Sequence, residues 1–170
     1  MQARGRVERV TIAAPTVTLT DVVAPFVATM SPDDPVVDVR PADASDPAEV
    51  LRAGADLIGT QRPPAPFRSR PLAVLPVWAY VRADHPWAAR RSVTLSELVV
   101  QPLVLLPPHF TAREAVDAAV GAAGASYASV VEAANGTVAQ ALAASGRGVA
   151  VVSDDPRHDL VPLAVDPADA

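Results

Sequence analysis

The sequence predicts an α/β protein built on parallel sheets, and three observations lead to this prediction. Short apolar segments alternate with segments whose apolar residues recur every three to four positions, which is the period of a helix. Most of the helical segments open on a side chain that can cap a helix, and several close on a glycine. The order strand, helix, strand occurs in both halves of the chain, and such crossovers join parallel strands.

The first sixty residues predict three strands and two helices. The strands are expected at residues 10–14, 36–40 and 56–59. Between the first two, apolar residues from Leu19 to Met30 fall on one face of a helix, with Thr18 as its N-cap and a kink or break at Pro25. The second helix has three agreeing start signals in the sequence DPAE, beginning at Asp46, and it ends at Gly54.

The second half repeats this alternation after a proline-rich connection at residues 61–66. Extended segments are expected at residues 68–75 and 78–81, and strands at 103–106, 129–133 and 149–152. Capping sequences at Thr94 and Thr111 and an N-cap at Asn135 predict three helices. Gly124 and Gly146 end the last two of them.

Composition indicates a folded protein without thiol chemistry. Half of the 170 residues are hydrophobic, the net charge is −5 and cysteine is absent. The densest basic group, Arg4, Arg6 and Arg9, is expected to be a solvated tail, and an acidic chain matches a phosphate backbone poorly. The three histidines lack the spacing of a metal motif. We therefore expect no direct DNA binding by this chain, no metal and no cofactor.

Targeting and catalytic motifs are also missing from the sequence. The first ten residues contain no apolar run, and the longest apolar stretches are too short to span a bilayer, so we expect a cytoplasmic protein without a membrane partner. The sequence contains no Gly-x-Ser-x-Gly elbow, P-loop or Gly-x-Gly-x-x-Gly fingerprint. The acidic pair Asp154-Asp155 is expected to be a solvated turn before Pro156. These observations favour a binding protein over an enzyme.

Four stretches in order resemble the substrate-binding domain of LysR-type transcriptional regulators. They are TIAAPTVTLTDVVAPFVATM, DPAEVLRAGADLIG, PVWAYVRADHPWAARRSVTLSELVVQPLVLLPP and ANGTVAQALAASGRGVAVVSDDP. The first resembles the family's opening strand and helix, and the third its crossing strand, Asp-His-Pro turn and short helix. The fourth resembles a helix, a Gly-x-Gly turn and a strand. The resemblance runs from about residue 10 to residue 165.

This resemblance implies a type II periplasmic-binding-protein-like fold, with two Rossmann-like lobes joined by two crossing strands. Residues 1–9 would form an N-terminal tail, residues 10–78 with 155–170 lobe I, and residues 79–154 lobe II. The crossings would fall near residues 78–82 and 153–156. The family's winged helix-turn-helix, and the strand and helix that usually close the domain, are not expected here, which fits either a fragment or a natural shortened protein.

The resemblance also implies a sensor function. A small effector, an organic or aromatic acid, would bind in the cleft between the lobes, and the domain would form a homo-oligomer or pair with full-length relatives. Two alternatives stay open: a freestanding small-molecule-binding or decoy protein of the same fold, and a small enzyme of that fold. An upstream helix-turn-helix would separate the first two, and turnover of a metabolite would indicate the third.

Candidate ligand-binding residues follow strands and precede helices, where free N–H groups and the helix dipole suit a polar ligand. They are Thr16, Thr18, Ser45, His109, Phe110, Thr111, Asn135 and Thr137. His109 would donate to a carboxylate and Phe110 would stack on an aromatic effector, unless they are a solvated loop residue and a core residue.

Other interpretations of these positions stay open. Thr18, Thr111 and Asn135 could be helix caps only. Arg113 could bind an anion or simply pair with Asp117 one turn later. Asp43, beside the expected pocket, would disfavour an anionic ligand.

Overall fold

The computed structural model describes residues 9–43, 45–60, 63–72 and 74–166. The chain divides into two compact units, Met1–Leu72 and Ala73–Ala170. Of the tail expected at residues 1–9, only Arg9 is described; it begins the first strand and its Nη1 lies 2.7 Å from an Asp38 carboxylate oxygen. The positions of Arg4 and Arg6 lie outside the described residues.

Unit 1 contains a three-stranded parallel sheet in the order β2-β1-β3. Its strands are β1 (Arg9–Ala14), β2 (Val36–Pro41) and β3 (Leu57–Ile58). These strands confirm the three that the sequence predicts in its first sixty residues. The core of the unit is small, because Ala13, Ala42 and Ala55 supply its buried side chains and Val50 and Ile58 pack against them.

One continuous helical segment follows β1 and consists of α1 (Thr16–Thr18), the π-helical turn η1 (Leu19–Val23) and α2 (Ala24–Val27). The predicted N-cap at Thr18 was wrong: the helix starts after Pro15, whose ψ is 148°, and Thr18 has helical angles of −64° and −37°. The break expected at Pro25 takes the form of the preceding π turn, since proline has no N–H to donate inside a helix.

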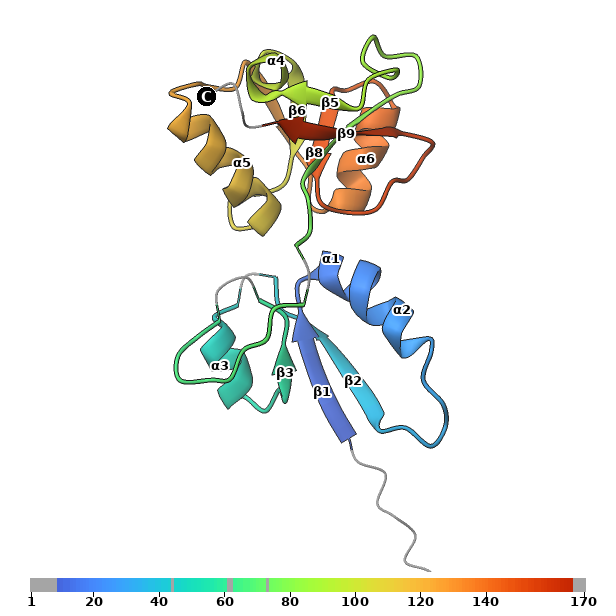
Figure 1. Ribbon diagram of the computed structural model, residues 1–170, viewed down its shortest axis with the longest axis vertical. Helices are drawn as coiled ribbons and strands as arrows, with labels where there is room; N and C mark the ends of the chain where they lie inside the picture. The colour runs from blue at the N-terminus through green and yellow to red at the C-terminus, as the bar shows by residue number, and fades with distance from the viewer. Residues whose placement is uncertain (1–8, 44, 61–62, 73, 167–170) are drawn as a thin grey trace, which may run out of the picture. The chain divides into compact units, whose positions relative to one another are not determined.

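The second helix of unit 1, α3 (Pro47–Arg52), forms as predicted. The Asp46 carboxylate accepts hydrogen bonds from the N–H groups of Ala48 at 2.7 Å and Glu49 at 3.2 Å. Gly54 follows the helix with a φ of +99°, a conformation that glycine adopts without steric cost. Figure 1 shows α1 and α2 on one side of the strands of unit 1 and α3 on the other.

Unit 2 contains a six-stranded mixed sheet in the order β5-β9-β4-β8-β6-β7. Its strands are β4 (Trp78–Val81), β5 (Ser92–Thr94), β6 (Pro102–Leu105), β7 (Ser129–Glu132), β8 (Val149–Val152) and β9 (Val161–Asp166). β6 is parallel to β7 and β8, whereas β4 is antiparallel to β8 and β9. The sequence analysis predicted β4, β6, β7 and β8 and did not predict β5 or β9.

The strand β9 places the end of the chain differently from the expected division into lobes. Residues 155–170 were expected with lobe I, but Ala164 in β9 pairs with Trp78 of β4 and Ser92 of β5, inside unit 2. The expected first crossing strand, β4, belongs to the same sheet. The difference arises because an apolar segment such as VPLAV does not reveal which strand it will pair with. Residues 167–170 lie outside the described residues.

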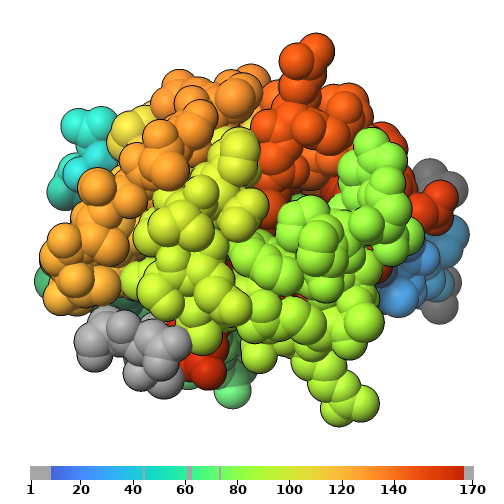
Figure 2. All heavy atoms as spheres, turned by 90° about the horizontal axis from the view of Figure 1, so that it is seen from above, coloured from blue at the N-terminus to red at the C-terminus, as the bar shows by residue number. Residues whose placement is uncertain are grey.

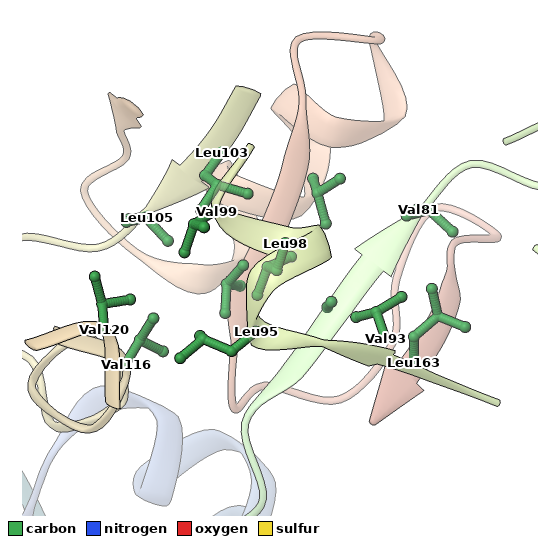
Figure 3. Packing of buried hydrophobic residues seen from close by; sticks show 13 residues of the cluster. Val81, Val93, Leu95, Leu98, Val99, Leu103, Leu105, Val116, Val120 and Leu163 are labelled. Atoms are coloured by element: carbon green, nitrogen blue, oxygen red, sulfur yellow. The ribbon is translucent and has the colours of Figure 1, made fainter. Parts of the chain in front are cut away.

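Helices cover both faces of this sheet. They are α4 (Leu95–Val99), α5 (Thr111–Ala122) and α6 (Gly136–Ala144). Alternate residues of β6 point to opposite faces, so Leu103 and Leu105 pack in the core beneath α4 and α5, while Val104 packs with α6. Figure 3 shows the α4–α5 side of this core, and Figure 2 shows α4 and α5 (yellow-green to orange) on the surface of the unit.

The helices of unit 2 begin and end largely where the sequence predicts. Thr94 and Glu97 form a reciprocal capping box at α4, and Asn135 caps α6. Gly124 and Gly146 follow α5 and α6 with φ values of +61° and +82°. In the parts of the chain that the structure describes, no helix is long and apolar enough to cross a membrane.

Candidate functional site

The predicted site residues lie at the carboxyl edges of the two sheets. In unit 1, β1 leads into Thr16 and Thr18, and the loop after β2 contains Ser45. In unit 2, β6, β7 and β8 are parallel, so the segments that follow them begin at one edge of the sheet. These segments hold the remaining candidates, His109, Phe110, Thr111, Asn135 and Thr137. Ligands of doubly wound sheets bind at such edges.

An aspartate already occupies the start of the first helix in unit 1. The backbone N–H of Thr16 donates to Asp43 Oδ1 at 2.8 Å, and its hydroxyl donates to Oδ2 at 2.7 Å. Asp43 is half-buried, whereas Thr16 and Ser45 are exposed. Asp43 therefore links the ends of β1 and β2 and places a carboxylate at this edge.

Thr18 lies inside the first turn and faces the end of β3. A Cβ placed on Gly59 would lie 3.5 Å from the Thr18 methyl carbon and 3.1 Å from Ala14 Cβ. The backbone after β3 thus passes close to β1 and α1, and a side chain at Gly59 would need its neighbours to shift. The methyl contact gives Thr18 a packing role in place of the predicted capping role.

In unit 2, α5 starts one residue earlier than predicted. Phe110 is the N-cap residue, with φ −83° and ψ 137°, and Thr111 is the first helical residue, so the capping role predicted for Thr111 was wrong. Among the described residues, no side chain caps this helix. Phe110 is half-buried against the core beneath α6, and the exposed His109 ring lies 4.8 Å from the Phe110 ring.

These helix starts give a direct comparison of two substitutions. Thr111→Ala should change the free energy of unfolding by less than about 0.5 kcal/mol, because no capping bond is lost. Asn135→Ala should cost about 1 kcal/mol, because Asn135 Oδ1 accepts from the Val138 N–H at 2.9 Å. Urea denaturation of both variants tests this difference. An equal loss in the two variants would show that Thr111 has a capping role after all.

Arg113 pairs within α5, as one of its two interpretations expected. Its Nε donates to Asp117 Oδ1 at 2.7 Å and its Nη1 donates to the Leu106 carbonyl at 3.0 Å. The Tyr127 hydroxyl donates to the same Asp117 oxygen at 2.5 Å. Burial, and then this bond, raise the pKa of Tyr127 above its usual range. Arg113 therefore anchors α5 to the end of β6.

The start of α6 combines a cap with a second carboxylate. Asn135 caps the helix, and Thr137 is exposed in its first turn. Asp154, which follows β8, lies directly against Gly136: a Cβ on Gly136 would collide with the carboxyl group of Asp154. The expected solvated turn was therefore wrong for Asp154, which is only 8% exposed, and right for Asp155, which is exposed.

Two buried side chains hold the loop after β8. The Tyr80 hydroxyl donates to the Asp154 carbonyl at 2.6 Å. Gln140, fully buried on α6, donates from Nε2 to the Asp155 carbonyl at 2.9 Å and accepts from the Arg157 N–H at 2.7 Å. Sequence analysis missed Tyr80, Gln140 and Asp154. A signal for Gln140 was present, since it lies beside buried Ala139 on the apolar side of its helix.

Unit 1 also has a shallow hollow of about 360 Å³ away from the carboxyl edge. It is lined by residues from the early parts of β1, β2 and β3 and from the segment around α2: Val10, Ile12, Phe26, Thr29, Met30, Asp34, Pro35, Val37 and Leu57. None of the predicted site residues lines this hollow.

Comparison with known proteins gives one family and many similar folds. A family model described as the LysR substrate binding domain matches residues 3–166. The regulatory domain of CcmR from Synechocystis PCC6803, solved with 2-PG, has a TM-score of 0.74 at 19% identity, over 94% of this chain and 81% of that chain. The BenM effector binding domain with benzoate has a TM-score of 0.76 at 18% identity, over 94% and 78%.

A longer relative shows how much of a whole regulator the chain represents. HinK, a LysR family transcriptional regulator from Pseudomonas aeruginosa, has a TM-score of 0.76 at 16% identity, over 96% of this chain and 60% of HinK. The chain thus spans less than two thirds of that regulator. These similarities confirm the expected α/β, type II periplasmic-binding-protein-like fold, and the family model covers nearly the entire sequence. The chain belongs to the LysR substrate binding domain family.

Proposed function

We propose that this chain is the effector-sensing part of a LysR-type transcription regulator and that it binds a small molecule at the carboxyl edges of its sheets without transforming it. The observation that carries this proposal is the family match over residues 3–166. The polar side chains at these edges support it, because Thr16, Asn135 and Thr137 open helices directly after strands. The CcmR and BenM domains were solved with 2-PG and benzoate, which are small molecules.

The anchoring of these edges suits a sensor. In unit 2, Arg113 fixes the start of α5, and Gln140 and Tyr80 fix the loop after β8. A site built on such fixed backbone needs little reordering when a ligand binds, which reduces the entropic cost of binding. We place the protein in the cytoplasm and expect no direct contact of this chain with DNA. The expected acidic character of the effector is revised below from the charges at these edges.

A ligand screen tests the proposed function. A small molecule present at about one hundred times its dissociation constant should stabilise the chain by roughly 2.7 kcal/mol. Thermal denaturation across a metabolite panel should therefore identify binders, and mass spectrometry of the mixture should recover each binder unchanged. Conversion of a binder to product would support the enzyme alternative. A panel without any binder would argue against the sensor function.

We also propose that the chain associates with a second copy or with a full-length relative through its open sheet edges. β2 and β7 are edge strands, and they expose apolar side chains: Val36, Val39, Val130 and Val131 are 38–45% exposed. Exposed apolar surface of this kind marks interaction sites. The unpaired backbone groups of an edge strand add hydrogen-bonding capacity.

Charged substitutions at these edges should weaken the association. Val39→Glu and Val131→Glu should each raise the dissociation constant at least tenfold, about 1.4 kcal/mol, because a buried unpaired charge is costly. Sedimentation velocity over a range of concentrations measures this change. Val100→Glu is the control, since Val100 is 64% exposed outside both edge strands. A monomer at every concentration, or an equal effect of Val100→Glu, would contradict this interface.

A further inference from the structure

We infer that two aspartates make this chain select an effector without a negative charge, one that presents an ammonium group or neutral hydrogen-bond donors to the carboxyl edges. The inference rests on the proposed function and names the charge class of the effector. The two residues are Asp43 in unit 1 and Asp154 in unit 2. Each lies at a helix start where a ligand carboxylate would otherwise find its donors.

In unit 1, the donors at the start of the helical segment are already used. The Thr16 N–H and hydroxyl donate to the two separate oxygens of Asp43, at 2.8 and 2.7 Å. An effector carboxylate at this place would have to displace Asp43 from both bonds and would meet its charge. An ammonium or amide N–H meets an acceptor there instead, because an ionised carboxylate has about four acceptor positions and can receive further donors.

In unit 2, Asp154 fills the corresponding place at α6. Its carboxyl group packs directly on the backbone of Gly136, the first residue of the helix, in the space that a Cβ would occupy. The first turn of a helix is where free N–H groups and the helix dipole favour an anion. Asp154 is more than nine-tenths buried, so this internal carboxylate is built into the unit.

The surrounding contacts hold Asp154 in this position. Tyr80 donates to the Asp154 carbonyl at 2.6 Å, and Gln140 binds the next residues of the loop from within the core. Asn135 Oδ1 takes the Val138 N–H of the same first turn. The donors at the α6 start are therefore shared by this chain's own oxygen atoms. At α5, the nearby cation Arg113 is engaged with Asp117 and the Leu106 carbonyl.

Matched probes of different charge test this selection. Benzoate, benzamide and benzylammonium share one ring, and cyclohexanecarboxylate, its carboxamide and cyclohexylmethylammonium share another. Titration calorimetry on the full chain should show the amide or ammonium member binding at least tenfold more tightly than the carboxylate. Asp43→Asn and Asp154→Asn should each shrink that preference at least threefold, because they remove the charge and keep the shape.

Two control substitutions remove the same charge elsewhere. Asp33→Asn lies in an exposed turn of unit 1, and Asp159→Asn lies in the exposed loop of unit 2, where asparagine also tolerates the φ of +54°. Both should leave the preference unchanged. Asp43→Asn keeps the test valid if Asp154→Asn fails to fold, because Asp43 lies in the other unit.

The outcomes separate the inference from the proposed function. If the carboxylates bind the wild-type chain as tightly as their amides, or if the two aspartate variants keep the full preference, the inference is overturned while the sensor function stands. If no member of either series binds at any charge, the proposed function fails and the inference fails with it. A preference for amide or ammonium that shrinks only in Asp43→Asn and Asp154→Asn supports both.

Discussion

Gly136→Ala is expected to destabilise unit 2 by about 2–3 kcal/mol, although alanine is ordinarily the better helix residue. The added methyl group would enter the space of the Asp154 carboxyl group, which is buried and held by the loop after β8. Urea denaturation followed by tryptophan fluorescence measures this loss, because both tryptophans, Trp78 and Trp87, lie in unit 2.

Two further variants show whether the collision itself is responsible. Gly121→Ala in α5 is the matched control: no atom of the described residues lies within 4 Å of its added methyl group, so it should stabilise the unit by about 0.5 kcal/mol. In an Asp154→Ala background, Gly136→Ala should lose most of its effect, which gives a coupling energy of about 2 kcal/mol. A neutral Gly136→Ala in the wild-type background would contradict the packing described for Asp154.

Gln140→Leu is expected to cost about 3 kcal/mol of unit 2 stability. Leucine fills a similar volume, but it leaves the Asp155 carbonyl and the Arg157 N–H without the bonds of 2.9 and 2.7 Å that Gln140 supplies. Each buried backbone group left unpaired costs about 1–3 kcal/mol. The same denaturation experiment measures the loss, and hydrogen exchange at the Arg157 amide should become faster.

Tyr80→Phe provides the graded comparison for Gln140→Leu. It removes one bond, from the Tyr80 hydroxyl to the Asp154 carbonyl, and should cost about half as much. If Gln140→Leu leaves both the stability and the protection of the Arg157 amide unchanged, the loop after β8 does not depend on Gln140.

Features that depend on neighbouring residues could be predicted from the sequence. The caps at Asp46, Thr94 and Asn135 form because each side chain reaches N–H groups two or three residues later. Thr18 and Thr111 are equally good capping residues and do not cap. A helix starts where the backbone turns, and this occurs after Pro15 and Phe110.

Features that depend on distant residues could not be predicted in this way. β5 and β9 are short strands whose identity depends on pairing, with each other and, for β9, with β4. The burial of Asp154 depends on Gly136, which lies far from it in the sequence and leaves room for the carboxyl group. The carboxyl edges were predictable from the order of strands and helices, but the internal carboxylates that occupy their helix starts were not all visible.

The most direct test of the proposed sensor function is an NMR titration of the full chain with the tightest binder from the ligand screen. Saturable shifts are predicted for the amides of Thr16, Asn135 and Thr137, which lie at the carboxyl edges. The amides of Met30 and Val37, at the hollow of unit 1, should not move. Shifts confined to that hollow, or shifts that do not saturate, would contradict a sensor site at the carboxyl edges.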